Sequence, residues 1–484
     1  MCRPVFVRRR TNPECDGRSR KTVHLVLSFR KPHLVRLAAA NANHRTHSRI
    51  GALPRSVGVD GPILRPEVAR RITRGVLLGL ALIQVAIIAA LGNSLPPHGI
   101  GDAYGEADAI RSAEYYATHG FQSHAGLPTI LYGTRFADDG WLGDLRHPRG
   151  QNQDATPLPD GVYTRYPPLA NWIAGLSEKM FGFRRLWAWR TVPVATGLLA
   201  LLCLVRLLAK SIGEDRAALM AIGVAVIPMT SGYMSALHYE GFAQALLLVQ
   251  LGLLVSDYSR YDRIRTSTLL FVGVCAFVQG FLSFDYAFVV TFSAVPLWLF
   301  RRAENRAIHW RSLISPILIA GLGFTLAHAL HFTEVAHFYG SWRTAGADLI
   351  DRARYRAVGA VGDAYLINLL FCAQTYVEVV LDPTNYHFGP ALFLALVFCA
   401  LLTTSPALRV SRARRGTELV VVGGRQFAGG VIAGLVVSTM WYAAMPRMSF
   451  VHTHIVPRLL FLAYFCALLA IVKSLRAATA VDNK

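Results

Sequence analysis

Runs of apolar residues, each about as long as a membrane-spanning helix, constrain the fold of this chain most strongly. A helix needs about 20 apolar residues to cross a bilayer, and a spanning segment must satisfy its backbone hydrogen bonds internally. Segment 364–381 is also apolar, but Glu378 and Asp382 favour an interfacial or re-entrant helix there over an eleventh span. The ten predicted spans are approximately 76–91, 191–208, 216–234, 238–257, 266–284, 286–300, 310–331, 389–404, 426–443 and 456–473. We therefore predict an all-α polytopic membrane protein with about 10–11 transmembrane helices.

The composition agrees with a membrane protein. Hydrophobic residues make up 53% of the 484 residues and charged residues only 16%, whereas a soluble protein has about 25% charged residues. The net charge of +21 is interpreted as an orientation signal and an attraction to lipid headgroups, because no basic-aromatic module indicates nucleic-acid binding. None of the seven cysteines has CxxC spacing, so neither a zinc site nor a disulfide framework is indicated.

Two regions differ sharply in character. Residues 1–72 are rich in arginine and lack periodicity, which favours a disordered cytoplasmic tail over a surface-binding arm. An upstream start codon that the cell does not use would also explain this region. It is not a signal peptide, because the first long apolar run begins too far from Met1. Residues 73–484 are predicted to form the transmembrane domain.

The positions of arginine and lysine predict the orientation of the helices. Short loops that are rich in these residues face the cytoplasm, and with a cytoplasmic N-terminus every second connection obeys this rule. These connections are 209–215, 258–265, 301–309, 405–425 and the C-terminal tail. The long loops 93–189 and 332–388 then lie on the extracytoplasmic side. Loop 332–388 departs from the rule, from which long loops are largely exempt; its arginines are Arg343, Arg352, Arg354 and Arg356.

This topology brings polar residues from separate connections to one membrane face. Ionisable residues beside apolar segments are costly unless they are paired or functional. A site with carboxylate, imidazole and guanidinium groups is therefore expected there. The candidate residues are Asp102, Glu106, Asp108, Arg165, Tyr166, His238, Tyr239, Glu240, Asp285, Tyr286, Arg447, His452 and His454.

Each of these residues also has a simpler interpretation. Glu240 and Asp285 could cap the helices that follow them, and Asp102 could belong to a glycine-rich turn. His452 and His454 could be interfacial residues, or could bind a metal ion together with a carboxylate, although a His-x-His spacing alone is a weak signal. The sequence leaves these alternatives open.

Two motifs in the first long loop resemble those of a known family. Glu106-Ala-Asp-Ala-Ile-Arg-Ser-Ala-Glu-Tyr-Tyr-Ala-Thr-His-Gly120, followed by Tyr166-Pro-Pro-Leu-Ala-Asn-Trp172, is similar to the first outer loop of C-type glycosyltransferases. The group with lipid A aminoarabinose transferases and protein O-mannosyltransferases, family 39, is the most similar. The sequence departs from the family pattern at two places. Where the family usually has an Asp-Glu pair, this sequence has Gly105-Glu106, with Asp108 two residues later. Where the family motif has a lysine, this sequence has Tyr166, directly after Arg165.

The resemblance implies a fold, a reaction and a set of roles. It implies a C-type bundle with a large first extracytoplasmic loop, in which a sugar moves from a polyprenyl-phosphate donor to a lipid, glycan or protein hydroxyl with inversion of the anomeric carbon. Glu106 or Asp108 would be the base, with Glu106 favoured by its spacing to Gly120. Arg165, and Arg447 or His454, would hold the phosphate. No cofactor is certain, and a divalent cation is left open.

Two other classes of function compete with this one. A transporter or lipid-binding protein would also place ionisable residues near apolar spans, but its acids would lie in mid-span and not at the outer ends. A noncatalytic scaffold with the same fold is the third possibility. We expect an enzyme of a bacterial inner membrane with its site on the periplasmic face.

Overall fold

The chain divides into two units, Met1–Val57 and Gly58–Lys484. A computed structural model describes parts of the second unit only, so most of the predicted basic tail lies outside the described residues. The described residues are 63–96, 103–129, 162–183, 185–304, 308–358, 365–381, 391–404, 407–411, 418–422, 424–447 and 455–478.

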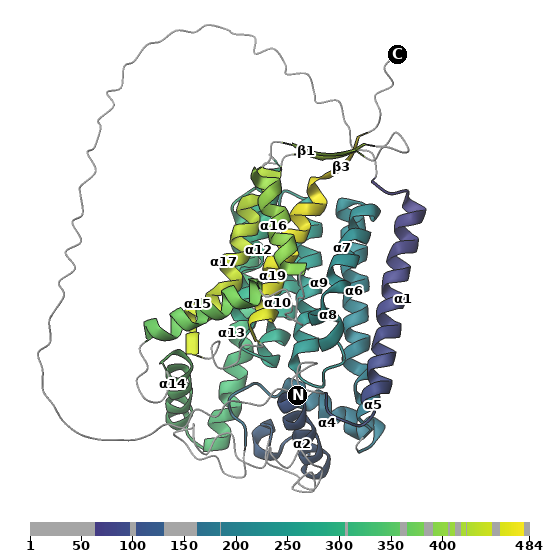
Figure 1. Cartoon of the computed structure of the whole chain (residues 1–484). Helices are drawn as coiled ribbons and strands as arrows, with labels where there is room; N and C mark the ends of the chain where they lie inside the picture. The colour runs from purple at the N-terminus through teal and green to yellow at the C-terminus, as the bar shows by residue number, and fades with distance from the viewer. Residues whose placement is uncertain are drawn as a thin grey trace, which may run out of the picture. The chain divides into compact units, whose positions relative to one another are not determined.

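Helices account for most of the described residues, which confirms the predicted helical fold class (Figure 1). The helices are α1 (Pro66–Leu91), α2 (Ala103–His119), α4 (Leu169–Phe181), α5 (Leu186–Trp189), α6 (Thr191–Ile212), α7 (Glu214–Val226), α8 (Pro228–Tyr233), α9 (Tyr239–Arg260), α10 (Thr266–Leu282), α11 (Ala287–Phe292), α12 (Ala294–Ala303), α13 (Arg311–Tyr339), α14 (Trp342–Val358), α15 (Tyr365–Leu381), α16 (Ala391–Thr404), α17 (Ala428–Ala444) and α19 (Ile455–Ser474). The strands are β1 (Ala407–Ser411), β2 (Glu418–Val422) and β3 (Leu475–Ala478).

Several of these helices are suited to a membrane. By length and composition, five could cross a bilayer, namely Pro66–Leu91, Leu186–Ile212, Tyr239–Arg260, Arg311–Tyr339 and Arg425–Ala444. Two shorter apolar helices are Thr266–Leu282 and Ala391–Leu402. The chain is thus an integral multi-pass membrane protein. Segment 364–381 forms a helix, α15, but whether it spans the membrane stays a prediction, as does the total of about ten spans.

Two predicted spans are each divided into two helices. Segment 216–234 forms α7 and α8, which are separated at Ile227 in an extended conformation. Pro228 causes this break, because proline disfavours a helical conformation in the residue before it. Segment 286–300 likewise forms α11 and α12, which meet at Ser293.

Two helices are longer than predicted. α1 begins at Pro66, with proline at its first positions and Glu67 in its first turn, both of which favour a helix start. It therefore includes the last residues of the segment assigned to the tail. α13 has 29 residues and is followed by Gly340 in the left-handed conformation, so it is about 43 Å long at 1.5 Å per residue. Because the apolar core of a bilayer is about 30 Å thick, α13 is long enough to extend beyond it.

Close helix packing surrounds α9, most of whose residues are buried. Gly252 of α9 lies against α6, where an added Cβ would be 3.1 Å from Leu204. A Cβ at Gly323 of α13 would collide with the backbone of Gly273 in α10. Small residues allow such close approach, which is how helices commonly associate in membranes. The packing fixes the ends of α9, α10 and α13, where polar residues gather.

The two long loops meet at one end of this helical unit. In Figure 1, α2, α4 and α5 lie together at the lower end, and α14 lies at the lower left. The Thr164 hydroxyl donates a hydrogen bond to Asp348 Oδ2 of α14 (3.1 Å), and His331 Nε2 of α13 lies 3.0 Å from the Thr164 carbonyl oxygen. Parts of the loops 93–189 and 332–388 therefore lie on the same side, as the charge distribution predicts.

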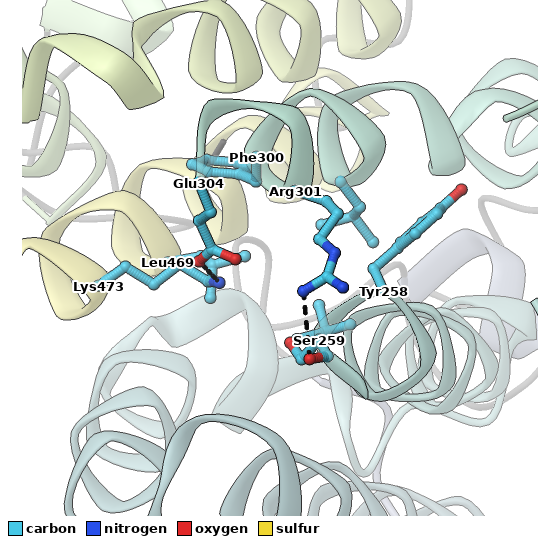
Figure 2. Close-up of a pocket in the computed structure, with 9 residues that line it drawn as sticks. Tyr258, Ser259, Phe300, Arg301, Glu304, Leu469 and Lys473 are labelled. Atoms are coloured by element: carbon cyan, nitrogen blue, oxygen red, sulfur yellow. Dashed lines mark hydrogen bonds and ion pairs between the residues drawn. The ribbon is translucent and has the colours of Figure 1, made fainter. Parts of the chain in front are cut away.

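The opposite end collects the loops that were predicted to be cytoplasmic. Lys473 of α19 pairs with Glu304, and Arg301 donates to the Ser259 carbonyl oxygen at 3.3 Å; these residues line a small pocket (Figure 2). Arg260 also donates to the Lys210 carbonyl oxygen at 3.2 Å. These contacts group the arginine-rich connections as predicted, while the side of the membrane on which they lie stays a prediction.

A small antiparallel sheet at this end was not predicted. β1 pairs with β2, and β2 pairs with β3, so the order is β1-β2-β3. Arg409 and Arg476 lie opposite Val420 of β2 in the two ladders. Two strands come from the connection after α16 and one from the C-terminal segment, so the sheet ties the end of α19 to that connection.

The grouping of the loops predicts how the protein is labelled in intact cells. Gln122 and Ser267 are both exposed, the first beyond α2 and the second at the start of α10. We expect a membrane-impermeant maleimide to label Gln122→Cys in intact cells, and Ser267→Cys only after permeabilisation. The parent protein is the control for its own cysteines. Labelling of both positions from the same side would refute the orientation.

Candidate functional site

The first feature of the site is a buried ion pair that holds α2. Glu106 in the first turn of α2 accepts two hydrogen bonds from the Arg190 guanidinium, from Nη1 to Oε1 at 3.0 Å and from Nη2 to Oε2 at 2.7 Å. The Leu237 backbone N–H also donates to Glu106 Oε1 at 3.2 Å. Both charged side chains are 1% exposed. This group joins α2 to the start of α6 and to the turn before α9.

The surroundings of Arg190 explain why a charge is tolerated there. Its guanidinium also donates to the carbonyl oxygens of Ser235 (3.0 Å) and Ser94 (3.1 Å). Burial raises the pKa of Glu106, and the charge and hydrogen bonds of Arg190 act in the opposite direction. Removing one partner of a buried pair typically costs about 3–5 kcal/mol. The pair is therefore a structural clamp on α2.

This clamp bears on the two predicted catalytic carboxylates. Glu106 uses both oxygens to accept N–H donors, so it would have to leave Arg190 in order to take a proton. Asp108 is half-buried and belongs to the same helix. Because successive residues of a helix are about 100° apart, the two side chains point in different directions, as expected. The assignment of either as the base stays a prediction, and the clamp argues for a supporting role for Glu106.

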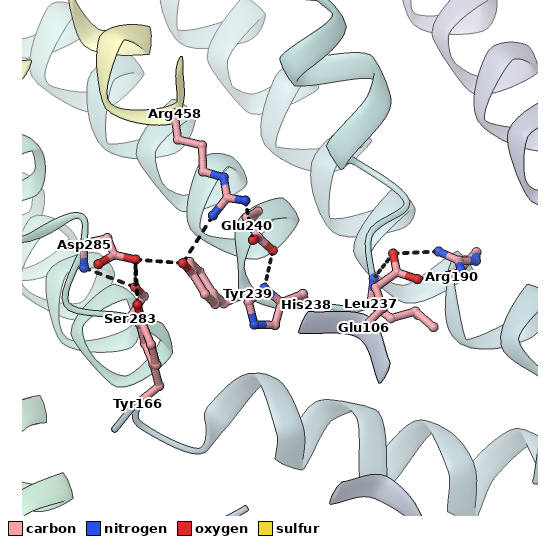
Figure 3. A network of polar contacts seen from close by, with 10 residues as sticks. All are labelled: Glu106, Tyr166, Arg190, Leu237, His238, Tyr239, Glu240, Ser283, Asp285 and Arg458. Carbon is pink, nitrogen blue, oxygen red and sulfur yellow. Dashed lines mark hydrogen bonds and ion pairs between the residues drawn. The ribbon is translucent and has the colours of Figure 1, made fainter. Parts of the chain in front are cut away.

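A second buried ion pair lies at the start of α9 (Figure 3). Arg458 Nη2 of α19 is 2.7 Å from Glu240 Oε1, and both side chains are 1% exposed. The other oxygen of Glu240, Oε2, is 2.6 Å from His238 Nδ1. Arg458 Nη1 also donates to the Tyr239 hydroxyl at 3.2 Å. Tyr239 and Glu240 thus contact the Arg458 guanidinium directly, and His238 is linked to it through Glu240.

Hydroxyl groups extend this network to Asp285 and Tyr166. Asp285 Oδ2 accepts hydrogen bonds from Tyr239 (2.7 Å), Ser283 (3.2 Å) and Tyr166 (3.4 Å) (Figure 3). Burial, followed by the negative charge of Asp285, raises the pKa of Tyr166 well above its ordinary value. The phenol therefore stays protonated and acts as a donor. The Tyr-Pro-Pro motif of the first loop is in this way fixed to the turn between α10 and α11.

The helix-capping interpretation of Glu240 and Asp285 is not what the structure shows. The N-cap residues of α9 and α11 are His238 and Tyr286, and neither makes a side-chain cap hydrogen bond. Glu240 pairs with two side chains, and Asp285 accepts from three hydroxyl groups. Both carboxylates belong to the polar network.

The two ion-paired groups lie next to each other. A Cβ added to Gly105 of α2 would be 2.8 Å from three atoms of the His238 ring. The residue after Gly105 is Glu106, so the His238 ring packs directly against the backbone of the helix turn that carries the first ion pair. Glycine at position 105 is needed for this close contact.

A group of arginines forms the outer part of the site. Arg356 of α14 lies over the rings of Tyr166 and Phe284, at 5.1 and 4.5 Å from their centroids. Burial, and then the positive charges of Arg352 and Arg356, lower the pKa of Arg165 to about 10. Arg352 donates to Asp348 Oδ1 at 2.7 Å. We call Arg165, Arg352 and Arg356 the arginine cluster.

Other predicted site residues are placed elsewhere or are not described. The Arg447 guanidinium carbon lies 5.2 Å from the centroid of the Tyr355 ring. Tyr355 directly precedes Arg356 of the cluster in the sequence. Asp102, His452 and His454 lie outside the described residues. Within the described ranges, no group of three or more His, Cys, Asp and Glu side chains could hold a metal ion.

Three features of this region were not predicted: the ion-pair roles of Arg190 and of Arg458, and the grouping of Arg352 and Arg356 near Arg165. Arg190 and Arg458 are ionisable residues at the start of apolar segments, which is itself a signal for pairing or function. Arg352 and Arg356 are four residues apart and so lie on one face of a helix. The departure of loop 332–388 from the positive-inside rule was the feature of the sequence that pointed to these two arginines.

Comparisons with known proteins give no sequence match. No protein-family model matches the chain, and no curated protein sequence matches it.

Solved structures that are similar to the chain include an archaeal oligosaccharyltransferase and ArnT. One is the oligosaccharyltransferase of Archaeoglobus fulgidus in complex with Zn and sulfate, with a TM-score of 0.39 and 13% identity over 82% of this chain and 48% of that one. The oligosaccharyltransferase AglB from Archaeoglobus fulgidus, in complex with an inhibitory peptide and a dolichol-phosphate, has a TM-score of 0.39 and 14% identity over 82% of this chain and 50% of that one. ArnT from Cupriavidus metallidurans in the apo state has a TM-score of 0.35 and 12% identity over 82% of this chain and 76% of that one.

The chain spans about half the length of the oligosaccharyltransferase.

The Glu106–Arg190 clamp predicts a loss of stability on substitution. Glu106→Gln keeps the shape of the side chain but leaves Arg190 without its counter-charge, so we expect it to lower the free energy of unfolding by about 3–5 kcal/mol. Thermal unfolding of the purified protein in detergent would measure this change. Asp108→Asn is the matched control on the same helix and should unfold close to the parent protein. A stable Glu106→Gln protein that had lost its activity would instead identify Glu106 as a chemical base.

Proposed function

We propose that this protein transfers a sugar from a polyprenyl-phosphate donor to an acceptor hydroxyl at the extracytoplasmic surface of the membrane. One observation carries the proposal most strongly: Arg356 of the arginine cluster lies over the ring of Tyr166, next to Arg165, and the Tyr166 hydroxyl donates to the buried carboxylate of Asp285. A binding site for an anion thus adjoins groups that can act on a hydroxyl and on a developing positive charge.

The arginine cluster has the properties of a phosphate site. It combines Arg165 of the first long loop with Arg352 and Arg356 of α14, and Asp348 is the carboxylate that pairs with Arg352. Like charges in a partly buried site are unfavourable, and an anion among them would relieve that cost. The planar guanidinium matches phosphate oxygens in pairs. The cluster therefore fits the phosphate of a lipid-linked sugar, which remains at the membrane surface because of its lipid tail.

Aromatic rings connect this cluster to the carboxylates. The Tyr166 ring stacks on Tyr239 at 5.7 Å, and the Tyr239 ring lies 4.2 Å from the His238 ring. A sugar between the cluster and His238 would lie over these rings. Glycosyl transfer passes through a state with positive charge on the sugar ring, and nearby carboxylates stabilise it. Glu240 and Asp285 lie close enough to this path to serve, with Asp108 as a further candidate on α2.

The position of the acids supports a transferase over a transporter. Glu240 lies in the first turn of α9, and Asp285 lies between α10 and α11. A transport path would be expected to place such acids near the middle of broken helices. The site lies instead at the ends of helices, beside the two long loops.

The activity itself is tested with defined donors. The purified protein in liposomes would be given radiolabelled polyprenyl-phosphate mannose or polyprenyl-phosphate arabinose, with total membrane lipid and protein as acceptors. We expect one donor to be consumed, with release of polyprenyl phosphate and label in the acceptor fraction. If the protein consumes neither these nor other monosaccharide donors, the proposal fails.

The arginine cluster makes a sharper prediction. A charged hydrogen bond contributes about 1.5–3 kcal/mol, so Arg356→Ala and Arg165→Ala should each raise the donor concentration for half-maximal rate by about 10- to 100-fold. Arg354→Ala is the matched control, because Arg354 is exposed on the same helix two residues away. Equal donor affinity in all three variants would assign the cluster to structure or lipid contact.

A further inference from the structure

The proposed transfer needs a group that accepts the proton of the attacking hydroxyl, and the geometry limits the choice. Glu106 is buried and accepts three N–H donors. Glu240 is 1% exposed and lies between Arg458 and His238. Asp285 is buried and accepts from three hydroxyl groups. Protonation of Glu106 or Glu240 would displace a fixed partner, and Asp285, at 1% exposure, is too deeply buried for an acceptor hydroxyl to reach.

His238 is placed differently. Its side chain is 18% exposed, against 1% for Glu240 beside it. It precedes α9 as the N-cap residue in an extended conformation, at the end of the helices where the two long loops meet. Its ring packs against Gly105 of α2 on one side and tilts against Tyr239 at 4.2 Å. The imidazole is thus held firmly but remains partly accessible.

Glu240 determines which ring nitrogen of His238 carries the proton. Glu240 Oε2 is 2.6 Å from His238 Nδ1. An ionised carboxylate can only accept, so Nδ1 is the protonated nitrogen of the neutral ring and Nε2 has the lone pair. Arg458, 2.7 Å from the other carboxylate oxygen, holds Glu240 in position. A base that is oriented by a third group is the usual arrangement in nucleophile activation.

We propose that His238 is the general base of the transfer, with Glu240 and Arg458 as positioning residues; this inference rests on the proposed function. His238 Nε2 takes the proton of the acceptor hydroxyl as the hydroxyl oxygen forms a bond to the anomeric carbon. The bond between that carbon and the phosphate oxygen breaks, and its electron pair leaves with the lipid phosphate at the arginine cluster. The imidazolium is stabilised by Glu240 and returns its proton to water after the acceptor leaves.

Chemical rescue tests this role directly. His238→Ala should lower the rate at saturating donor by about 100- to 10,000-fold, with the half-saturating donor concentration largely unchanged. Added imidazole should restore part of the rate, because a small base can enter the space left by the ring. Substituted imidazoles should rescue in the order of their basicity, which a purely structural role would not produce. His337→Ala, at an exposed position of α13, is the control and should be fully active and insensitive to imidazole.

A double substitution tests Glu240. Glu240→Gln keeps the size of the side chain but offers an amide N–H to His238, so it should lower the rate at saturating donor. In the His238→Ala protein rescued by imidazole, the same change should have little further effect, since Glu240 acts through His238. Equal losses in both backgrounds would make Glu240 a structural residue only. If Glu240→Gln does not fold, the rescue experiment still decides the role of His238.

The outcomes distinguish this inference from the function on which it depends. A parent protein that consumes no donor refutes the proposed function and the inference together. An active parent with an active His238→Ala variant refutes the inference alone. The inference alone is also refuted if His238→Ala is inactive and imidazole does not rescue it, while Asp108→Asn is inactive as well. That result would identify Asp108 as the base.

Discussion

Charge burial at the end of the helices is the constraint on which the site depends. Two guanidinium–carboxylate pairs, Glu106–Arg190 and Glu240–Arg458, have side chains that are 1% exposed. The desolvation of such groups is costly unless their remaining donors and acceptors are also satisfied. Here the surrounding carbonyl oxygens, a backbone N–H, an imidazole and a phenol supply further partners. These contacts join each ion pair to the surrounding polar groups.

The two pairs fix different parts of the molecule. Glu106–Arg190 holds the loop helix α2 to the membrane helix α6, and Glu240–Arg458 holds α9 to α19. The close contact of Gly105 with the His238 ring joins them. The loops thus contribute residues of the candidate site, and the membrane helices position them. This division explains why α9, the most buried of the candidate spans, also begins with the residues of the site.

The sequence allowed much of this arrangement to be predicted, and the omissions have physical causes. Apolar length located most of the helices, and the charge of the connections grouped the loops. Apolar length alone does not reveal a break within a segment, so the division of 216–234 into α7 and α8 at Pro228 was not predicted. The ends of α1 and α13 depend on caps such as Gly340. Strand β3 comes from a segment far from β1 and β2 in the sequence, so no local pattern indicated that it would complete the sheet.

The site was predicted in its residue types more than in its pairing. Glu240, Asp285, His238 and Tyr166 were expected on one face, and they form one network. Their partner Arg458 was not expected, because a single arginine in an apolar run does not show which carboxylate it will meet. Glu106 was selected by its spacing to Gly120, and spacing carries no information about Arg190. Contacts between segments far apart in the sequence determine whether a carboxylate is available for the reaction or stabilises the structure.

The pairing of Arg458 with the start of α9 has a consequence for how the chain is assembled. Arg458 follows Tyr239 by 219 residues, so Glu240 enters the membrane region of the growing chain long before its guanidinium partner has been synthesised. An uncompensated carboxylate among apolar helices is costly, so the final position of α9 depends on α19. A chain interrupted before Arg458 would leave Glu240 without its guanidinium partner.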